Sequence, residues 1–236
     1  MLKINTIVLH RITADNLSSE FEDVNLKNFE LFLDYISKNI INKKMNILLT
    51  FDDGNDSDYK VVLPLLIKYK IKAIFFIVAN RINKPGYLTK FQINSLVNAG
   101  MEIGSHSFSH QNMTKLSQYD VIFEFKKSKK IIEDCISREI NAFSFPYGKF
   151  NKELVLYAQQ CGYSKIFTSK HGVKNDNGKI FPRNSLNSKM NFNQGIKNIF
   201  PSKSLEIKWK VEDLSKTFIK NIFGENLYKK IRNFIL

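Results

Sequence analysis

The chain has 236 residues, with 36 Lys or Arg against 22 Asp or Glu and a formal net charge of +14. This length is sufficient for one full hydrophobic core. The lysines are scattered and accompany many Asn and Ile residues, so we expect a solvated basic surface and no nucleic-acid partner.

Apolar runs of strand character alternate with helical patterns along most of the chain. The predicted strands are Thr6–Leu9, Ile47–Phe51, Ala73–Val78, Met101–Ile103, Ala142–Phe145 and Lys165–Thr168. The predicted helices are Leu26–Ile41, Asp58–Tyr69, a segment from the Thr89-x-x-Gln92 capping box to Gly100, Ser117–Cys135 and Asn151–Gln160. Such alternation is typical of parallel strands covered by helices, so the sequence predicts an α/β fold.

The chain after Phe192 has a different pattern, with short amphipathic helices and no further strand. The apolar residues at helical spacing are Val211, Leu214, Phe218 and Ile222, followed by Leu227, Tyr228, Ile231, Phe234 and Ile235. We therefore predict an α/β domain at residues 1–195 and an amphipathic helical extension at residues 196–236. Basic residues exceed acidic ones in the extension, so its apolar stripe would either pack on the domain or lie on an anionic membrane.

Two short segments contain the residues with the clearest chemistry. One contains the adjacent carboxylates Asp52 and Asp53, and the other contains His106 and His110. Taken singly, each has an ordinary explanation, as a turn or as two solvated histidines. Both segments follow strand-like runs, however, so both would lie at the carboxyl ends of strands, where α/β proteins build their sites.

Asp53, His106 and His110 form a set of three ligands for a divalent metal. Imidazole nitrogen and carboxylate oxygen are the usual ligands of catalytic zinc, and three protein ligands leave a position for water. These ligand types favour zinc, with cobalt, nickel and manganese as alternatives. Such a metal lowers the pKa of water and polarises a carbonyl oxygen, so Asp52 could act as a general base beside it. Because Gly54 allows the chain to turn, both aspartates could approach one centre.

The two segments resemble motifs of the polysaccharide deacetylases of the NodB-homology type, carbohydrate esterase family four. Thr50–Gly54 is similar to the first motif of this family, which implies that Asp52 is the catalytic base and Asp53 a metal ligand. His106 and His110 are similar to the second motif, which implies that both bind the metal.

Phe143–Gly148 resembles the third motif of the family. The resemblance implies that Pro146 and Tyr147 contact the substrate and that the Tyr147 backbone N–H stabilises the oxyanion. A fixed N–H donor suits amide hydrolysis because negative charge develops on the carbonyl oxygen. Many members carry an arginine in this motif that holds the catalytic aspartate, whereas this chain has Ser144 there. Arg183 could replace that arginine.

The source of the general acid is a second departure. The last motif of the family usually supplies a C-terminal histidine, but no histidine follows His171. A branch that includes exopolysaccharide deacetylases resembles a circularly permuted barrel whose N-terminal strand ends in the acid histidine, and Ile7-Val8-Leu9-His10 is similar to that strand. His10 is therefore either the general acid or a polar residue at the end of a buried strand.

The resemblance implies an incomplete (β/α) barrel and a metal-dependent hydrolase that removes N-acetyl groups from an amino sugar. The sugar would belong to a surface-polysaccharide or glycoconjugate precursor and could be nucleotide-linked, lipid-linked or oligomeric. Two alternatives stay open: a hydrolase of another amide or ester on the same fold, and a catalytically silent carbohydrate-binding module. The oligomeric state is not defined by the sequence.

The N-terminal residues run directly into the first predicted strand, without the pattern of a signal peptide. We therefore expect a cytoplasmic enzyme, with peripheral contact to the inner membrane face through the C-terminal helices. Cys135 and Cys161 are too few for a disulfide scaffold and are expected to be reduced structural thiols.

Overall fold

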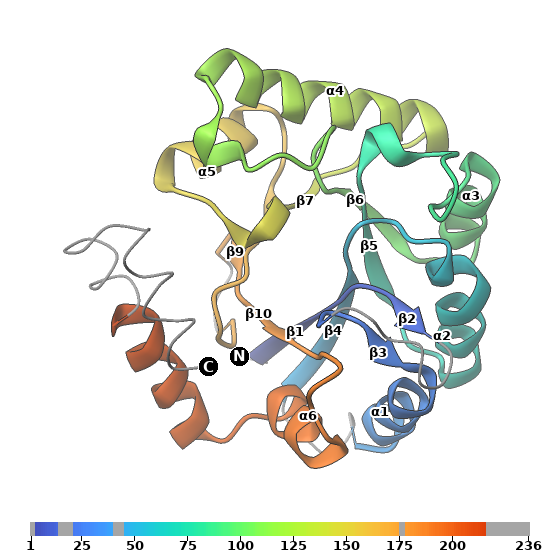
Figure 1. Cartoon of the computed structure of the whole chain (residues 1–236), viewed down its shortest axis with the longest axis vertical. Helices are drawn as coiled ribbons and strands as arrows, with labels where there is room; N and C mark the ends of the chain where they lie inside the picture. Colours follow the sequence, from blue (N-terminus) through green and yellow to red (C-terminus); the bar gives the residue numbers. More distant parts are fainter. Residues whose placement is uncertain (1–2, 14–20, 40–44, 175–177, 216–236) are drawn as a thin grey trace.

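Eight parallel strands form the centre of the computed structural model, which describes residues 3–13, 21–39, 45–174 and 178–215 (Figure 1). The strands lie in the order β10-β1-β4-β5-β6-β7-β8-β9. Their bounds are β1 Lys3–Leu9, β4 Met45–Phe51, β5 Ala73–Ile77, β6 Glu102–Ser105, β7 Ala142–Ser144, β8 Lys165–Phe167, β9 Ile180–Phe181 and β10 Arg183–Ser185. The six predicted strands are confirmed, and β9 and β10 are additional to them.

The two ends of this sheet are joined by one short stretch of chain. β9 pairs with β8, and β10 pairs with β1 on the other side. Pro182 separates β9 from β10. Proline has no backbone N–H, so a ladder cannot continue through it and the strand changes partner there. The sheet therefore curls into a nearly closed barrel, which confirms the predicted incomplete (β/α) fold.

The strands are buried on both faces, as parallel strands in α/β proteins usually are. All five residues of β5 are buried. Phe75 belongs to the large core cluster, which also contains buried residues of the helices, whereas Phe76 packs with Ile74, Ala142 and Phe167 in a separate small cluster. Adjacent residues of one strand thus serve two different cores, inside and outside the barrel.

Helices surround the barrel (Figure 1). They are α1 Leu26–Asn39, α2 Leu63–Tyr69, α3 Lys90–Asn98, α4 Gln118–Ile136, α5 Lys152–Gln160 and α6 Phe192–Ile199. Four single turns join them to the strands, η1 Asp58–Val62, η2 Ala79–Arg81, η3 Met113–Lys115 and η4 Pro146–Gly148, and β2 Ile12–Thr13 pairs with β3 Val24–Asn25. The predicted capping box is present at the start of α3, where Thr89 and Gln92 satisfy each other's backbone N–H groups.

The observed helices differ from the predicted ones in two places. The helix expected over 58–69 begins as a π-helical turn, η1, before α2 continues it. α6 was not predicted, although Asn191 and Gln194 form a second capping box at its start. The expected domain boundary after residue 195 falls inside α6, and the division itself stays a prediction.

Residues 203–215 form a further helix, which contacts the barrel through Trp209. The indole is only 6% exposed and stacks on the ring of His171, with a centroid separation of 5.6 Å. Val211 and Leu214, expected on the apolar stripe, are exposed to solvent. The rest of the predicted amphipathic extension, 216–236, lies outside the described residues. Within the described part of the chain, no helix has the length and apolar character needed to span a membrane.

Replacing Trp209 with alanine is expected to lower the free energy of unfolding by about 3 kcal/mol, because a large buried aromatic side chain is removed. Ile207→Ala is the matched control on the same helix, since Ile207 is 62% exposed. We expect the control to change stability by less than about 0.5 kcal/mol. Urea unfolding of both variants measures the difference, and equal stabilities would show that the helix does not dock through Trp209.

Candidate metal centre and active site

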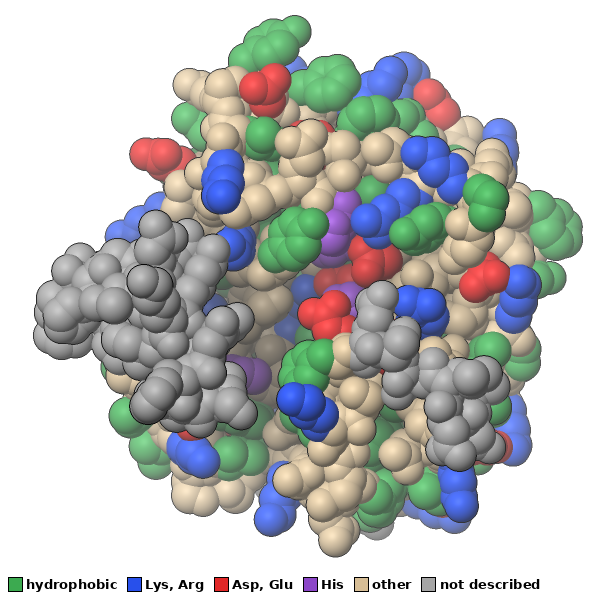
Figure 2. Space-filling view, in the orientation of Figure 1, with side chains coloured by type: hydrophobic (Ala, Val, Ile, Leu, Met, Phe, Trp, Pro, Cys, Tyr) green, Lys and Arg blue, Asp and Glu red, His purple; other side chains and the backbone are tan. Residues whose placement is uncertain are grey.

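The functional side chains gather where the strands end. A cleft of about 670 Å³ opens at this edge of the barrel. Seven of the predicted site residues line this cleft, together with His171: His10, Asp52, Asp53, His106, His110, Tyr147 and Arg183. Figure 2 shows acidic and histidine side chains in the hollow near the centre of this face. His10 and Arg183, more than 170 positions apart in the chain, line the same cleft because β1 and β10 pair side by side in the barrel.

A tight turn after β4 brings the two adjacent aspartates to the cleft. Asp53 and Gly54 both have left-handed backbone conformations, with φ of 78° and 70°. This conformation is easy for glycine but costs an aspartate roughly 1 kcal/mol. Such strain is common at functional sites. The turn allows Asp52 and Asp53 to approach one centre, as the sequence predicted.

Asp53, His106 and His110 lie close enough together to hold a metal ion. Each offers one ligand atom, and these atoms all lie within 4.8 Å of one another. His106 Nδ1 lies 2.8 Å from the carbonyl oxygen of Ser144. Nδ1 must carry the proton in this contact, so Nε2 of a neutral ring keeps its lone pair for a metal. The residues present therefore fit a divalent cation.

His110 is suited to metal binding by its surroundings. Its Nε2 lies 3.2 Å from Asp53 Oδ1. Burial, reinforced by His106, lowers the pKa of His110 to about 4 despite the nearby Asp53 carboxylate. The ring is therefore neutral near pH 7, which is the protonation state that metal binding requires.

Arg81 is a neighbour of this cluster that the sequence reasoning missed. Its Nη1 donates a hydrogen bond of 2.9 Å to Asp53 Oδ1, and its guanidinium lies over the Tyr87 ring. Arg81 ends η2, shortly after buried strand β5. A charged residue just beyond a buried strand was therefore an available signal in the sequence.

Asp52 is held by a buried bidentate ion pair. Arg183 Nη1 and Nη2 each donate a hydrogen bond of 2.8 Å to the carboxylate, and Ser144 Oγ donates one of 3.1 Å. Burial by itself would raise the pKa of Asp52, but the Arg183 charge and hydrogen bonds overcome burial and hold that pKa well below its usual range. Asp52 is consequently an ionised carboxylate that can accept a proton, and Arg183 lies where the sequence predicted the replacement arginine.

Ser144 completes this arrangement. Arg183 Nη2 also donates a hydrogen bond of 2.8 Å to Ser144 Oγ, so the serine hydroxyl bridges the arginine and Asp52. Ser144 ends β7 and Arg183 begins β10, so the two groups come from strands that do not pair with each other. The small serine leaves the space that the Arg183 guanidinium fills.

His10 lies on the same cleft, just past the end of β1. Its Nε2 is 3.5 Å from the Glu22 carboxylate, a second cleft residue that the sequence reasoning missed. His10 is close enough to Asp52 to act on it electrostatically. The position agrees with a proton donor, and that role stays a prediction.

The two predicted substrate contacts of the third motif, Tyr147 and Pro146, differ in whether they reach the cleft. Tyr147 is 65% exposed on the cleft, has a left-handed φ of 58°, and its ring centroid lies 4.7 Å from that of His110. Pro146 is buried at the start of η4 and is absent from the described cleft lining. Its contact with substrate stays a prediction without support from its position.

The fold and the site define a class: a parallel barrel whose cleft contains a buried, arginine-paired carboxylate and a group of one aspartate and two histidines that could hold a metal ion. The model of the polysaccharide deacetylase family matches residues 40–166. The chain belongs to the polysaccharide deacetylase family.

Curated proteins with similar sequences include deacetylases. The chain is 30% identical over 138 residues to a peptidoglycan-N-acetylglucosamine deacetylase of Bacillus cereus, an alignment that covers 58% of this chain and 62% of that protein. It is 36% identical over 109 residues to the peptidoglycan-N-acetylmuramic acid deacetylase PdaC of Bacillus subtilis, with coverage of 46% and 22%. The chain thus spans less than two thirds of the length of these curated relatives.

Solved structures show the same fold. The deacetylase PplD of Streptococcus pyogenes, solved with acetate, superimposes with a TM-score of 0.75 at 20% identity, over 84% of this chain and 99% of that one. IcaB of Ammonifex degensii superimposes with a TM-score of 0.70 at 21% identity, with coverage of 82% and 95%. The fold is therefore the NodB-type barrel that the sequence predicted.

Proposed function

We propose that the chain is a metal-dependent carbohydrate N-deacetylase. The observation that carries this proposal is the buried Asp52–Arg183 pair beside Asp53, His106 and His110, because it places a fixed base next to a ligand set. Asp53, His106 and His110 would hold the metal. A divalent ion there, with zinc favoured by the ligand types, would polarise the acetyl carbonyl and lower the pKa of water.

The residues of the chain would then divide the proton transfers. Asp52 accepts a proton from the attacking water, whose oxygen forms the new bond to the acetyl carbon. The Tyr147 backbone N–H donates a hydrogen bond to the carbonyl oxygen as charge develops on it. His10 gives a proton to the leaving amine, so the products are acetate and a free amino sugar. Arg183 and Ser144 keep Asp52 oriented and ionised.

The proposed substrate is an acetylated amino sugar within an oligomer or a glycoconjugate precursor. The relatives named for peptidoglycan deacetylation support an N-acetylated sugar as the acyl donor. A cleft of about 670 Å³ agrees with a ligand larger than an acetate ion. A silent binding module is less well supported, because a pure sugar site does not need an oriented buried base.

Acyl donors of different chemistry test this proposal. Zinc-loaded protein is incubated with N-acetylglucosamine oligomers, an N-acetylated peptide and an aryl acetate, and acetate release is measured for each. The proposal predicts release from the sugar oligomers at a rate well above that from the peptide. Release from the peptide or the ester alone would instead identify a hydrolase of another acyl group on this fold.

His110→Ala is expected to abolish stoichiometric zinc binding, because one of the three proposed ligands is lost. His171→Ala is the control, since His171 lines the same cleft but lies outside the ligand set. Isothermal titration of the metal-free proteins with zinc measures both. Equal zinc binding by the two variants would show that His110 is not a ligand.

A further inference from the structure

Helix α4 carries a buried carboxylate that the proposed reaction does not use. Glu124 lies in the middle of α4 and is only 4% exposed. Among the described residues Glu124 forms no ion pair, whereas two lysines elsewhere on α4, Lys129 and Lys130, pair with Glu133 and Asp134. A buried carboxylate without a cationic partner is costly unless hydrogen bonds compensate for the lost hydration.

The Glu124 carboxylate accepts three hydrogen bonds from the loop between the two proposed histidine ligands. Its Oε2 accepts the backbone N–H groups of Phe108 and Ser109, each at 2.9 Å. Its Oε1 accepts the hydroxyl of Ser109. One carboxylate therefore satisfies three donors that lie between His106 and His110.

This loop has a conformation that needs external support. Ser107 and His110 both have left-handed φ values, 68° and 61°. For residues other than glycine, each such conformation costs roughly 1 kcal/mol or more. Within the loop, only a hydrogen bond of 2.9 Å from the His110 N–H to Ser107 Oγ joins these two strained residues. The geometry of His110 thus depends on what holds the loop from outside.

The loop is held from two sides. On one side, the N–H groups of Ala79 and Asn80 in η2 donate to the carbonyl oxygens of Ser107 and Phe108, at 3.1 and 3.0 Å. On the other side, α4 supplies Glu124 and an aromatic contact. The Phe108 ring packs edge-on against Phe123, with a centroid separation of 5.6 Å.

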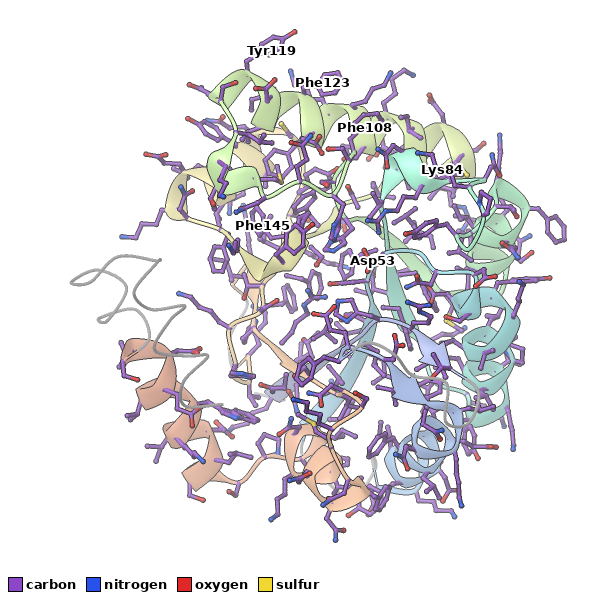
Figure 3. The ribbon with its side chains drawn as sticks, viewed as in Figure 1. Asp53, Lys84, Phe108, Tyr119, Phe123 and Phe145 are labelled. Carbon is purple, nitrogen blue, oxygen red and sulfur yellow. The ribbon has the colours of Figure 1, made fainter. Side chains whose placement is uncertain are left out.

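Figure 3 shows the same arrangement. Phe108 and Phe123 lie together at the rim beside α4, and Asp53 lies nearer the middle of the barrel. Because Glu124 follows Phe123 in sequence, the carboxylate and the aromatic contact fix the same stretch of loop. α4 therefore packs against and hydrogen-bonds the segment that places His110 next to Asp53.

We propose that Glu124 is a positioning residue for the metal centre, which fixes the 107–109 loop so that His110 and His106 converge on one ion. This inference rests on the proposed metal site. Glu124 does not touch the metal or the substrate; it acts through the backbone amides that it binds. Groups that orient a metal ligand typically change metal affinity by about 10–100-fold when they are replaced.

Glu124→Gln tests the proposal, because it keeps the size of the side chain and removes the charge and one acceptor oxygen. Zinc affinity is measured by titration against a competing chelator, and the visible absorption spectrum of the cobalt-substituted protein reports the coordination geometry. We expect zinc affinity to fall by about 10–100-fold, with an altered cobalt spectrum. Asp134→Asn, an exposed carboxylate on the same helix, is the matched control and should bind zinc as the unmodified chain does.

Ser109→Ala is a second variant that removes the hydroxyl bond to Glu124 and keeps the backbone N–H bond, and it also loses the exposed bond from Gln111 to the same hydroxyl. It is expected to weaken zinc binding less than Glu124→Gln does, and it keeps the test decisive if Glu124→Gln fails to fold. Urea unfolding of the metal-free proteins separates loss of stability from loss of metal geometry. Unchanged zinc affinity and an unchanged cobalt spectrum in a folded variant would overturn the positioning role. Absence of zinc binding by the unmodified chain would instead remove the proposed metal centre itself.

Discussion

Replacing Asp52 with asparagine is expected to lower kcat for deacetylation by about 10²–10⁴-fold, the usual contribution of a general base. Asparagine keeps the shape of the side chain and can still accept hydrogen bonds from Arg183 and Ser144, but it cannot take a proton from water. Zinc binding should remain stoichiometric, because Asp52 lies outside the set formed by Asp53, His106 and His110.

Steady-state kinetics and a zinc titration on the same preparation measure both properties. Asp56→Asn is a suitable control, since this nearby carboxylate is paired with Lys60 on the surface and does not line the cleft. A kcat for Asp52→Asn within tenfold of the unmodified chain would mean that another group accepts the proton.

Arg183→Met should lower the free energy of unfolding of the metal-free protein by about 3–5 kcal/mol, because it leaves the Asp52 carboxylate buried without a partner. Arg183 itself is 2% exposed, so methionine can occupy much of its volume without exposing a polar group. The double variant Asp52→Asn/Arg183→Met should lose less stability than the sum of the two single variants, since neither charge is then left alone.

The same pair gives a direction for pH dependence. With Arg183 present, the folded-state pKa of Asp52 lies below its unfolded value, so the pair stabilises the fold above the usual aspartate pKa of about 3.9 and loses that contribution as pH falls. In Arg183→Met, burial acts without the opposing arginine charge and raises the pKa of Asp52 relative to the unmodified chain. Protonation of Asp52 at acid pH then removes the buried charge and lessens the loss of stability. Urea unfolding should therefore show the largest stability difference near pH 7 and a smaller one near pH 4. A difference that does not depend on pH would contradict this origin.

Local patterns were sufficient to predict much of this molecule. The strands from β1 to β8 that form the sheet are apolar runs, and α3 and α4 begin at capping residues that the sequence displays. The grouping of Asp53, His106 and His110 was also predictable, because Asp53 and His106 follow closely on β4 and β6, which end at the same edge, and His110 lies on the loop that His106 begins. Asp52 and Asp53 needed only a turn, which Gly54 supplies.

Features that depend on packing between distant segments were not predictable in this way. β9 has only two residues and β10 consists of three polar ones, so neither shows an apolar run; each exists because it completes the ladder of another strand on one side of Pro182. Glu124 is one polar residue in a helix, and its partners are defined only when the loop before η3 packs on α4. Arg81 likewise acquires its partner, Asp53, from a different strand end.

The C-terminal segment shows a further limit of pattern reasoning. Helical spacing grouped Val211 and Leu214 with the apolar residues that follow them, yet both are exposed in the described helix. The residue that docks this helix is Trp209, whose contact with His171 extends to the cleft wall. Within the described residues, the stacked Trp209 and an ion pair between Glu206 and Lys3 of β1 join this helix to the barrel.

The most direct test of the proposed function is acetate release from N-acetylglucosamine oligomers by three preparations in parallel: metal-free protein, zinc-loaded protein and zinc-loaded Asp52→Asn. We predict substantial acetate release from the zinc-loaded unmodified chain and little from the other two preparations. Equal acetate release with and without metal, or an Asp52→Asn variant as active as the unmodified chain, would contradict it.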